Sequence, residues 1–117
     1  MQRRTVSGAR TPEELETLLE DAFVTRDRES LVALFEHEAV LGAARREARG
    51  ADQIARLATA LWRRDESYLA DPQRVIQARD TALLVTRRGI NVVRRGDGGW
   101  RYAIALLDLY PIEGAAR

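Results

Sequence analysis

The chain has 117 residues, 45% hydrophobic and 32% charged, which is typical of one globular domain with a single core. Its 19 basic residues are all arginine and nearly balance 18 acidic ones, and a net charge of +1 argues against a nucleic-acid-binding protein. The absence of cysteine and the presence of one histidine, His37, exclude a disulfide framework, a thiol nucleophile, a thiolate metal site and most zinc sites.

The first ten residues, MQRRTVSGAR, contain arginines but no apolar segment after them. We therefore expect a disordered lead-in over 1–10 rather than a secretory signal. The longest apolar run is too short to cross a bilayer, so we expect no membrane contact and a cytoplasmic location. A single domain is expected over 11–112, followed by a tail over 113–117.

Helix signals fill the first half of the chain. Thr11, Pro12 and Glu14 form a helix start, with a capping Thr, a Pro in the first turn and a Glu placed for a capping box. Asp27 is placed to cap a shorter helix that runs through Phe35, and a third helix is expected after Gly50. The apolar stripes of the three are Leu15, Leu18, Leu19, Ala22 and Phe23; Leu31, Leu34 and Phe35; and Ile54, Leu57, Ala58, Leu61 and Trp62.

The second half is rich in β-branched and aromatic residues. Segments 73–80, 81–88, 90–95 and 100–110 are separated by turn signals and predict antiparallel strands joined by hairpins. Segment 39–50 leaves room for a further strand or a short hairpin. The predicted fold class is α+β, with three helices packed on one face of a curved, mostly antiparallel sheet.

The last strand is apolar on both faces. Strict alternation places Trp100, Tyr102, Ile104, Leu106 and Asp108 on one face and four Ala and Leu residues on the other. An antiparallel sheet usually exposes one face to water, and the chain has no spare helix to cover a second apolar face. We therefore expect a homodimer that packs sheet against sheet.

Four stretches carry a family resemblance: DRESLVALFEHEAVL (27–41), RGADQIARL (49–57), RDTALL (79–84) and DGGWRYAI (97–104). With the order of elements, they resemble the nuclear transport factor 2-like superfamily, and within it the small SnoaL-like and ketosteroid-isomerase-like proteins. The resemblance implies a cone-shaped α+β barrel, a conical cavity between helices and sheet, and frequent dimerisation. This fold hosts many activities, so the resemblance implies no reaction.

The known active sites of that superfamily match the chain only in part. Where its isomerases have a carboxylate base, the sequence has Leu41 or Gly42, and Phe23 lies about where such a site places a Tyr. Its epoxide hydrolases use an Asp-Arg-Asp relay with Tyr and Asn. The residue types for such a relay are present at Arg79, Asp80, Asn91, Tyr102 and Asp108.

Asp108 is the first candidate for chemistry. If it shares the concave face with Tyr102, partial burial raises its pKa toward the range useful for acid/base catalysis. The alternative is a strand end that is solvated or paired with Arg101 or Arg79. The lone imidazole of His37, between two Glu at an expected helix end, is interpreted as solvated.

Five other residues are candidates for ligand binding. Asn91 is suited to orient a carbonyl, or is an ordinary polar residue beside a turn, and the Tyr102 hydroxyl either enters a pocket or lies at the rim of the core. Trp62 and Tyr68 flank the end of the third helix, where a cavity mouth or simple core packing is expected. Phe23, on the first expected helix, is the fifth candidate for ligand binding.

Two functions remain open. The first is a homodimeric protein that binds a small hydrophobic molecule in the cavity. The alternative is an acid/base enzyme of the isomerase, cyclase or hydratase/hydrolase type that needs no cofactor, with Asp108 as acid or base. No phosphate loop, dinucleotide motif or metal-ligand spacing is present in the sequence, so neither a cofactor nor a metal is expected.

Overall fold

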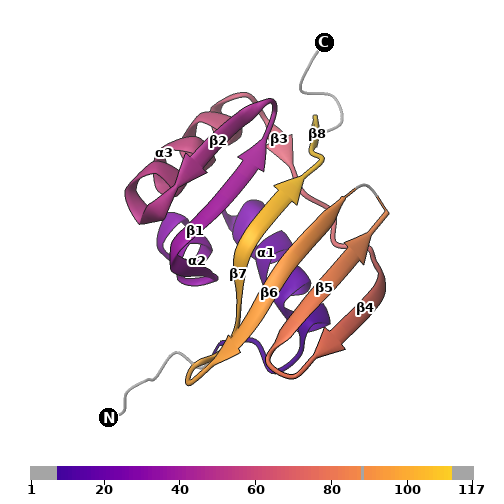
Figure 1. Ribbon diagram of the computed structural model, residues 1–117. Coiled ribbons are helices and arrows are strands. Elements are labelled where there is room, and N and C mark those ends of the chain that lie inside the picture. The colour runs from indigo at the N-terminus through magenta and orange to yellow at the C-terminus, as the bar shows by residue number, and fades with distance from the viewer. Residues whose placement is uncertain (1–7, 88, 112–117) are drawn as a thin grey trace.

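The computed structural model describes residues 8–87 and 89–111, with three helices behind one curved sheet (Figure 1). The helices are α1 (Pro12–Thr25), α2 (Arg28–Ala33) and α3 (Gly50–Arg63). The strands are β1 (Phe35–Ala43), β2 (Arg46–Arg49), β3 (Glu66–Ser67), β4 (Pro72–Ala78), β5 (Thr81–Thr86), β6 (Ile90–Gly96), β7 (Gly99–Leu107) and β8 (Tyr110–Pro111). The predicted α+β class and helix count are confirmed for these residues.

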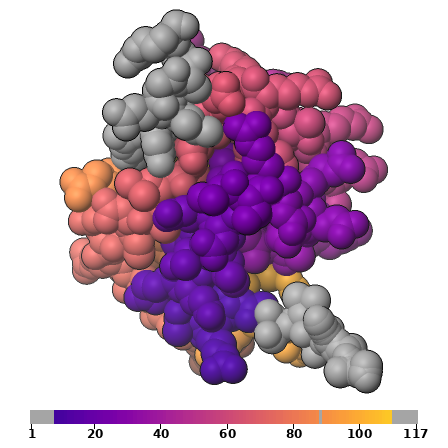
Figure 2. All heavy atoms as spheres, turned by 180° about the vertical axis from the view of Figure 1, so that it is seen from behind, coloured from indigo at the N-terminus to yellow at the C-terminus, as the bar shows by residue number. Residues whose placement is uncertain are grey.

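The main sheet has six strands in the order β2-β1-β7-β6-β5-β4, and β3 pairs with β8 in a separate ribbon. All adjacent strands of this sheet pair in antiparallel fashion, except β1 and β7, which pair in parallel. The sheet is curved and does not close on itself (Figure 1), and the expected packing of three helices on a curved, mostly antiparallel sheet is confirmed. Figure 2 shows the helical side, where α1 crosses the middle of the molecule.

Local signals fix the helix starts as expected. The Thr11 side chain accepts a hydrogen bond from the Glu14 backbone, and Asp27 caps α2 through the Ser30 backbone. The expected end of α2 was wrong, because Phe35 belongs to β1, where it lies opposite Tyr102 in the parallel ladder. Their rings are 5.1 Å apart, so this core contact favours a strand at Phe35.

A β-bulge in β7 exchanges the two faces of that strand. Val93 lies opposite Tyr102, but the next residue along β6, Val92, lies opposite Ile104, so Ala103 is the extra residue. Trp100 and Tyr102 therefore face the helices, and beyond the bulge Ala105 and Leu107 do. Strict alternation along the whole strand was wrong, since Ile104 and Leu106 lie on the outer face.

The outer face of the sheet carries an apolar row across five strands. Ile76, Leu83, Val92, Ile104 and Val40 lie opposite one another in successive ladders, and we call them the outer row. Ile104 is 42% exposed, and Ile76 and Leu83 are exposed to a similar extent. The outer row is flanked by two further exposed apolar side chains, Ile90 and Leu106.

The segment before α1 packs on the sheet. Ala9 is fully buried and pairs with Trp100, whose backbone N–H donates to the Ala9 carbonyl. Of the expected lead-in, residues 8–10 are described and Ala9 packs against β7; residues 1–7, residue 112 and the expected tail lie outside the described residues. Within the described ranges, no helix combines the length and apolarity that a membrane span needs.

Candidate functional site

A carboxyl group lies in the middle of the core. Glu16 falls on the apolar stripe of α1 with Leu15, Leu19 and Phe23, and it is 0% exposed. Ionised side chains are almost never buried without partners, since a charge loses its hydration energy in an apolar interior. The hydrogen-bond partners of Glu16 therefore determine how its carboxyl group is stabilised in the core.

Three side chains from the far side of the core donate to Glu16. The Tyr68 hydroxyl donates to Oε1, the Tyr102 hydroxyl donates to Oε2 at 2.5 Å, and Asn91 Nδ2 donates to Oε2 at 3.0 Å. All three donors are buried. We call these four residues the Glu16 cluster. It joins α1 to β6, β7 and the segment after β3.

Burial raises the pKa of the Glu16 carboxyl, and the hydrogen bonds from Tyr102, Tyr68 and Asn91 counteract this only in part. Burial also raises the pKa of the Tyr68 and Tyr102 hydroxyls, and the negative charge of Glu16 acts in the same direction. The tyrosines therefore keep their protons, and Glu16 is the group that titrates. A buried carboxyl with a raised pKa can exchange a proton with a bound molecule.

Asn91 connects the cluster to the backbone of β7. Its Oδ1 accepts a hydrogen bond of 2.8 Å from the Leu106 N–H, while its Nδ2 donates to Glu16. The β6–β7 ladder ends at the pair Val92 and Ile104, just beyond the bulge, so the Asn91 amide takes the role of a ladder bond at Leu106. Asn91 is therefore fixed at both ends of its amide.

Aromatic rings pack beside Tyr68, one of the four residues of the cluster. Phe23 lies edge-on to Trp62 with ring centres 5.9 Å apart, and 6.1 Å from the ring of Tyr68. All three are buried, so Trp62 and Tyr68 lie in the core of the described structure. The Trp62 indole N–H has no acceptor among the described residues.

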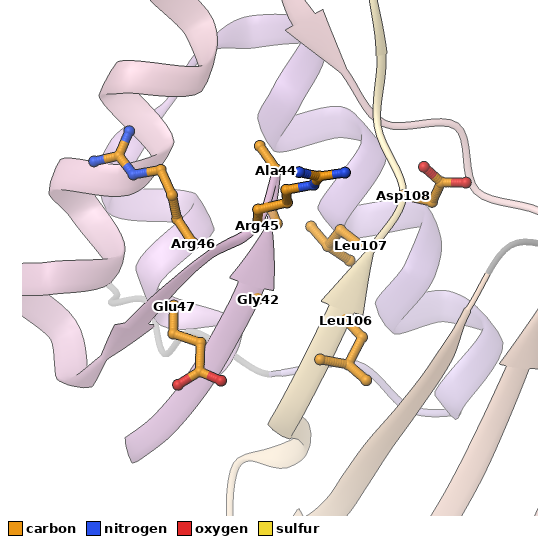
Figure 3. Close-up of a pocket in the computed structure, with 9 residues that line it drawn as sticks. Gly42, Ala44, Arg45, Arg46, Glu47, Leu106, Leu107 and Asp108 are labelled. Carbon is orange, nitrogen blue, oxygen red and sulfur yellow. The ribbon is translucent and has the colours of Figure 1, made fainter.

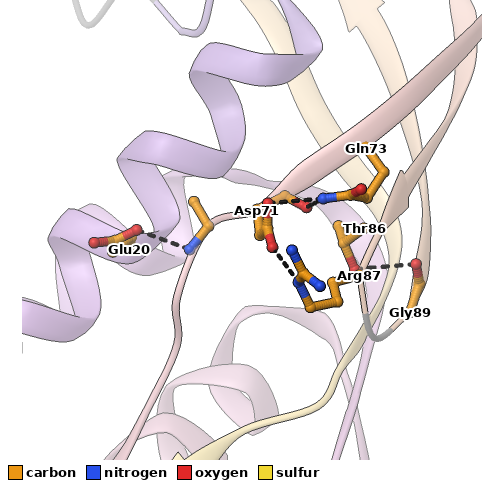
Figure 4. Close-up of polar contacts among 7 residues, drawn as sticks. Glu20, Asp71, Gln73, Thr86, Arg87 and Gly89 are labelled. Carbon is orange, nitrogen blue, oxygen red and sulfur yellow. Dashed lines mark hydrogen bonds and ion pairs between the residues drawn. The ribbon is translucent and has the colours of Figure 1, made fainter.

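The residues that follow Tyr68 make polar contacts with α1 and with the β5–β6 turn (Figure 4). Glu20, one turn after Glu16 on α1, accepts a hydrogen bond of 2.7 Å from the Ala70 N–H. Asp71 pairs with Arg87 at 2.5 Å. These contacts hold the connection from β3 to β4 against α1 and the β5–β6 turn, and so they fix the approach of Tyr68 to Glu16.

Asp108 does not belong to this cluster. It follows the last residue of β7 and is exposed, because the bulge turns the end of the strand so that Leu107 faces the core instead. It borders an open hollow of about 550 Å³ beside the β1–β2 turn, lined also by Arg45, Arg46 and Glu47 (Figure 3). The expected shared face of Asp108 and Tyr102 was wrong.

The residue types of the epoxide-hydrolase relay are not brought together. Asn91 and Tyr102 meet at Glu16, but Asp80 pairs with Arg95 at 2.7 Å on the surface, and Asp108 is exposed elsewhere. His37 is exposed, as expected, although it lies in β1 rather than at a helix end. Over 8–87 and 89–111, no group of three His, Cys, Asp or Glu is placed to hold a metal ion.

Glu16 is the residue that the sequence analysis missed. The sequence spacing places Glu16 on the buried face of α1, because it lies four residues after Pro12, three before Leu19 and seven before Phe23. An acidic residue at a core position of an amphipathic helix requires partners, and two tyrosines and an asparagine supply them.

No known protein-family profile matches this sequence, and no curated protein does. Solved structures do match its fold. One is a ketosteroid isomerase-like protein from Erwinia carotovora atroseptica SCRI1043, with TM-score 0.68, 18% identity, and coverage of 86% of this chain and 94% of that one.

Two further matches have the same architecture. A protein of unknown function with a cystatin-like fold from Nostoc punctiforme PCC 73102 has TM-score 0.65 and 19% identity, over 84% of this chain and 87% of that one. A nuclear transport factor 2-like protein from Novosphingobium aromaticivorans DSM has TM-score 0.62 and 20% identity, over 89% and 81%. The chain therefore has the cystatin-like fold of nuclear transport factor 2-like proteins, as the sequence resemblance predicted.

Proposed function

We propose that this protein is a cytoplasmic homodimer that binds a small, mainly apolar molecule between α1, α3 and the concave face of the sheet. The observation that carries the proposal is the Glu16 cluster, a set of convergent polar groups inside an aromatic and aliphatic core. Sites for small molecules combine an apolar lining with a few fixed polar groups in this way. The ring pair of Phe23 and Trp62 supplies the apolar lining.

The outer row supports the dimer. Apolar side chains on five neighbouring strands form a continuous surface that no described helix covers, since the helices lie behind the sheet (Figure 1). In the proposed twofold dimer each copy presents the same patch to the other, so the outer row of one copy packs on the outer row of its partner. Association would remove the exposed surface of Ile76, Leu83 and Ile104 from water.

Ligand binding is tested with toluene as an apolar probe, by NMR of protein labelled at Leu, Ile and Val methyl groups. Toluene is expected to shift the methyl signals of Leu19 and Leu57, which face the core, and to leave those of Leu83 and Ile104 unchanged. Shifts confined to the outer face, or no shifts up to the solubility of toluene, would contradict the binding proposal.

The dimer is tested by sedimentation equilibrium. The wild-type protein is expected at twice the chain mass of 13.2 kDa, and Ile104→Asp is expected at the single-chain mass. The matched control is Val24→Asp, because Val24 is 69% exposed on α1, away from the outer row, and should leave the dimer intact. A wild-type monomer at tens of micromolar protein would refute this part.

A second candidate is an acid/base enzyme that needs no cofactor, with Glu16 rather than Asp108 as the proton-exchanging group. The raised pKa of the buried Glu16 carboxyl favours it. Hydrogen–deuterium exchange at the carbons beside the carbonyl of cyclohexanone, followed by proton NMR, tests it. Exchange that is accelerated by wild-type protein and by Asp108→Asn, but not by Glu16→Gln, is the expected result; equal rates with all three proteins exclude it.

A further inference from the structure

A groove separate from the core opens between α1 and α2. It has a volume of about 430 Å³ and shares no residue with the Glu16 cluster. Its apolar lining consists of Leu18 and Ala22 on α1 and of Ala33 and Leu34 at the end of α2. Hollows of this size that combine an apolar lining with a few polar groups are typical of sites for small molecules.

Two carboxylates also line the groove, Asp21 on α1 and Glu29 on α2, and both residues are exposed. Neither carboxylate has an ion-pair or hydrogen-bond partner among the described residues. In the same part of the chain no arginine or histidine lines the groove, although Arg101 donates to the Ala33 backbone carbonyl at 3.3 Å. The described lining therefore carries two negative charges and no positive one, so it attracts a cation.

The two hydroxyl groups of the lining can only accept further hydrogen bonds. The Thr25 hydroxyl donates to the Asp21 backbone carbonyl at 3.0 Å, and the Ser30 hydroxyl donates to the Asp27 carboxylate at 2.7 Å. Because neither partner oxygen can donate, each hydroxyl has used its one hydrogen and keeps only lone pairs. Asp21 and Glu29 likewise only accept. Every polar side chain of the described lining therefore offers acceptors, and a complementary ligand must bring donors.

The class of ligand follows from these properties. An anion would be repelled by the two carboxylates, and a neutral alcohol brings a single donor. A primary ammonium group brings a positive charge, three N–H donors and no acceptor, and an alkylamine carries this charge at neutral pH as lysine does. An attached apolar body would cover the apolar lining of Leu18, Ala22, Ala33 and Leu34.

We propose that the groove between α1 and α2 is a second binding site, which takes a small primary amine with an apolar body in its ammonium form. The site does not depend on what binds at the Glu16 cluster. It makes Asp21 and Glu29 the residues that recognise the positive charge, and Thr25 and Ser30 additional acceptors for the ammonium hydrogens.

The test compares three six-carbon probes near neutral pH: hexylammonium, hexyltrimethylammonium, which keeps the charge but has no N–H, and hexanol, which is neutral. Binding is followed by NMR of protein labelled at Leu and Ala methyl groups. Hexylammonium is expected to shift the signals of Leu18 and Ala33 and to leave those of Leu19 and Leu57 in the core unchanged. Its affinity is expected to be about two- to tenfold higher than that of either other probe.

Variants separate charge recognition from apolar contact. Asp21→Asn and Glu29→Gln keep the shape of each side chain, and each is expected to weaken hexylammonium about two- to fivefold and to leave hexanol unchanged. The matched control is Glu13→Gln, because Glu13 is an exposed acid of α1 that does not line the groove, and it should alter neither affinity. Ala33→Leu places a larger side chain in the groove and is expected to weaken all three probes.

Several results would overturn the proposal. These are equal affinities of hexylammonium and hexanol, the same loss with Glu13→Gln as with Asp21→Asn and Glu29→Gln, or no shift of Leu18 and Ala33 at tens of millimolar hexylammonium. Nα-acetyl-lysine N-methylamide has the same ammonium group but polar amides, and it should bind more weakly than hexylammonium. Equal or tighter binding would assign the groove to a lysine side chain of another protein and would overturn the small-molecule assignment. Toluene binding is followed at Leu19 and Leu57, so the proposed function stands or fails separately.

Discussion

Replacing Glu16 by Gln should change how the stability of the protein depends on pH. Because burial raises the pKa of the Glu16 carboxyl above 4.5, the folded state holds this proton more tightly than the unfolded chain does. The contribution of Glu16 to stability is therefore greatest below pH 4.5 and falls as the pH rises through the raised pKa. One group can account for a slope of at most about 1.4 kcal/mol per pH unit in that window. The amide of Glu16→Gln does not titrate, so the variant should lack this slope.

Urea denaturation at several pH values between 4 and 8, followed by tryptophan fluorescence, measures the effect, because both tryptophans are buried. The free energy of unfolding of Glu16→Gln minus that of wild type should increase from pH 4.5 upward and level off above the raised pKa. Glu13→Gln, at an exposed position in the first turn of α1, is the matched control. A difference between Glu16→Gln and wild type that is constant with pH, or that decreases as the pH rises, would refute the assignment of Glu16 as a buried group with a raised pKa.

Three further predictions concern stability. Gly99 has a φ of +112°, and a Cβ there would lie 2.6 Å from a backbone oxygen, so Gly99→Ala should lower the free energy of unfolding in urea by more than about 1 kcal/mol. Gly96→Ala is the control, because a Cβ at Gly96 has nothing within 4 Å, and it should cost less than that. Equal losses for the two variants would contradict the explanation. Asn91→Ala should cost about 1–3 kcal/mol, because Glu16 loses a donor and a backbone N–H loses its acceptor, and a loss below about 0.5 kcal/mol would show that water replaces the amide. Asp108→Asn should leave both stability, within about 0.5 kcal/mol, and cyclohexanone affinity unchanged, and a marked loss of either would return Asp108 to the site.

The elements that were predicted correctly depend on short-range signals. Thr11 and Asp27 cap helices through bonds to backbone atoms three residues away, and such bonds form wherever the local sequence allows them. The turns at Asp80 and Gly89 likewise separated the strands β4, β5 and β6 without reference to the rest of the fold.

The errors depend on long-range contacts. The extra residue at Ala103 is visible only in the pairing of β7 with β6, and it decides which side chains of β7 face inward. The strand at Phe35 depends on pairing with Tyr102, which is 67 positions along the chain from it by their residue numbers. Asn91, Tyr68 and Tyr102 were identified singly, but their common partner Glu16 lies on another element, and no spacing in the sequence relates them.

The Asn91 side chain connects the core of the protein to the strand that carries Leu106 on its outer face. Its nitrogen bonds to the carboxyl in the core, and its oxygen bonds to the backbone of Leu106, whose own side chain is 52% exposed on the outer face. The same amide therefore links the β7 backbone at Leu106 to the carboxyl of Glu16 through two consecutive hydrogen bonds. By thermodynamic reciprocity, if an outer-face contact at Leu106 changes the proton affinity of Glu16, protonation of Glu16 changes the affinity of that contact by the same free energy.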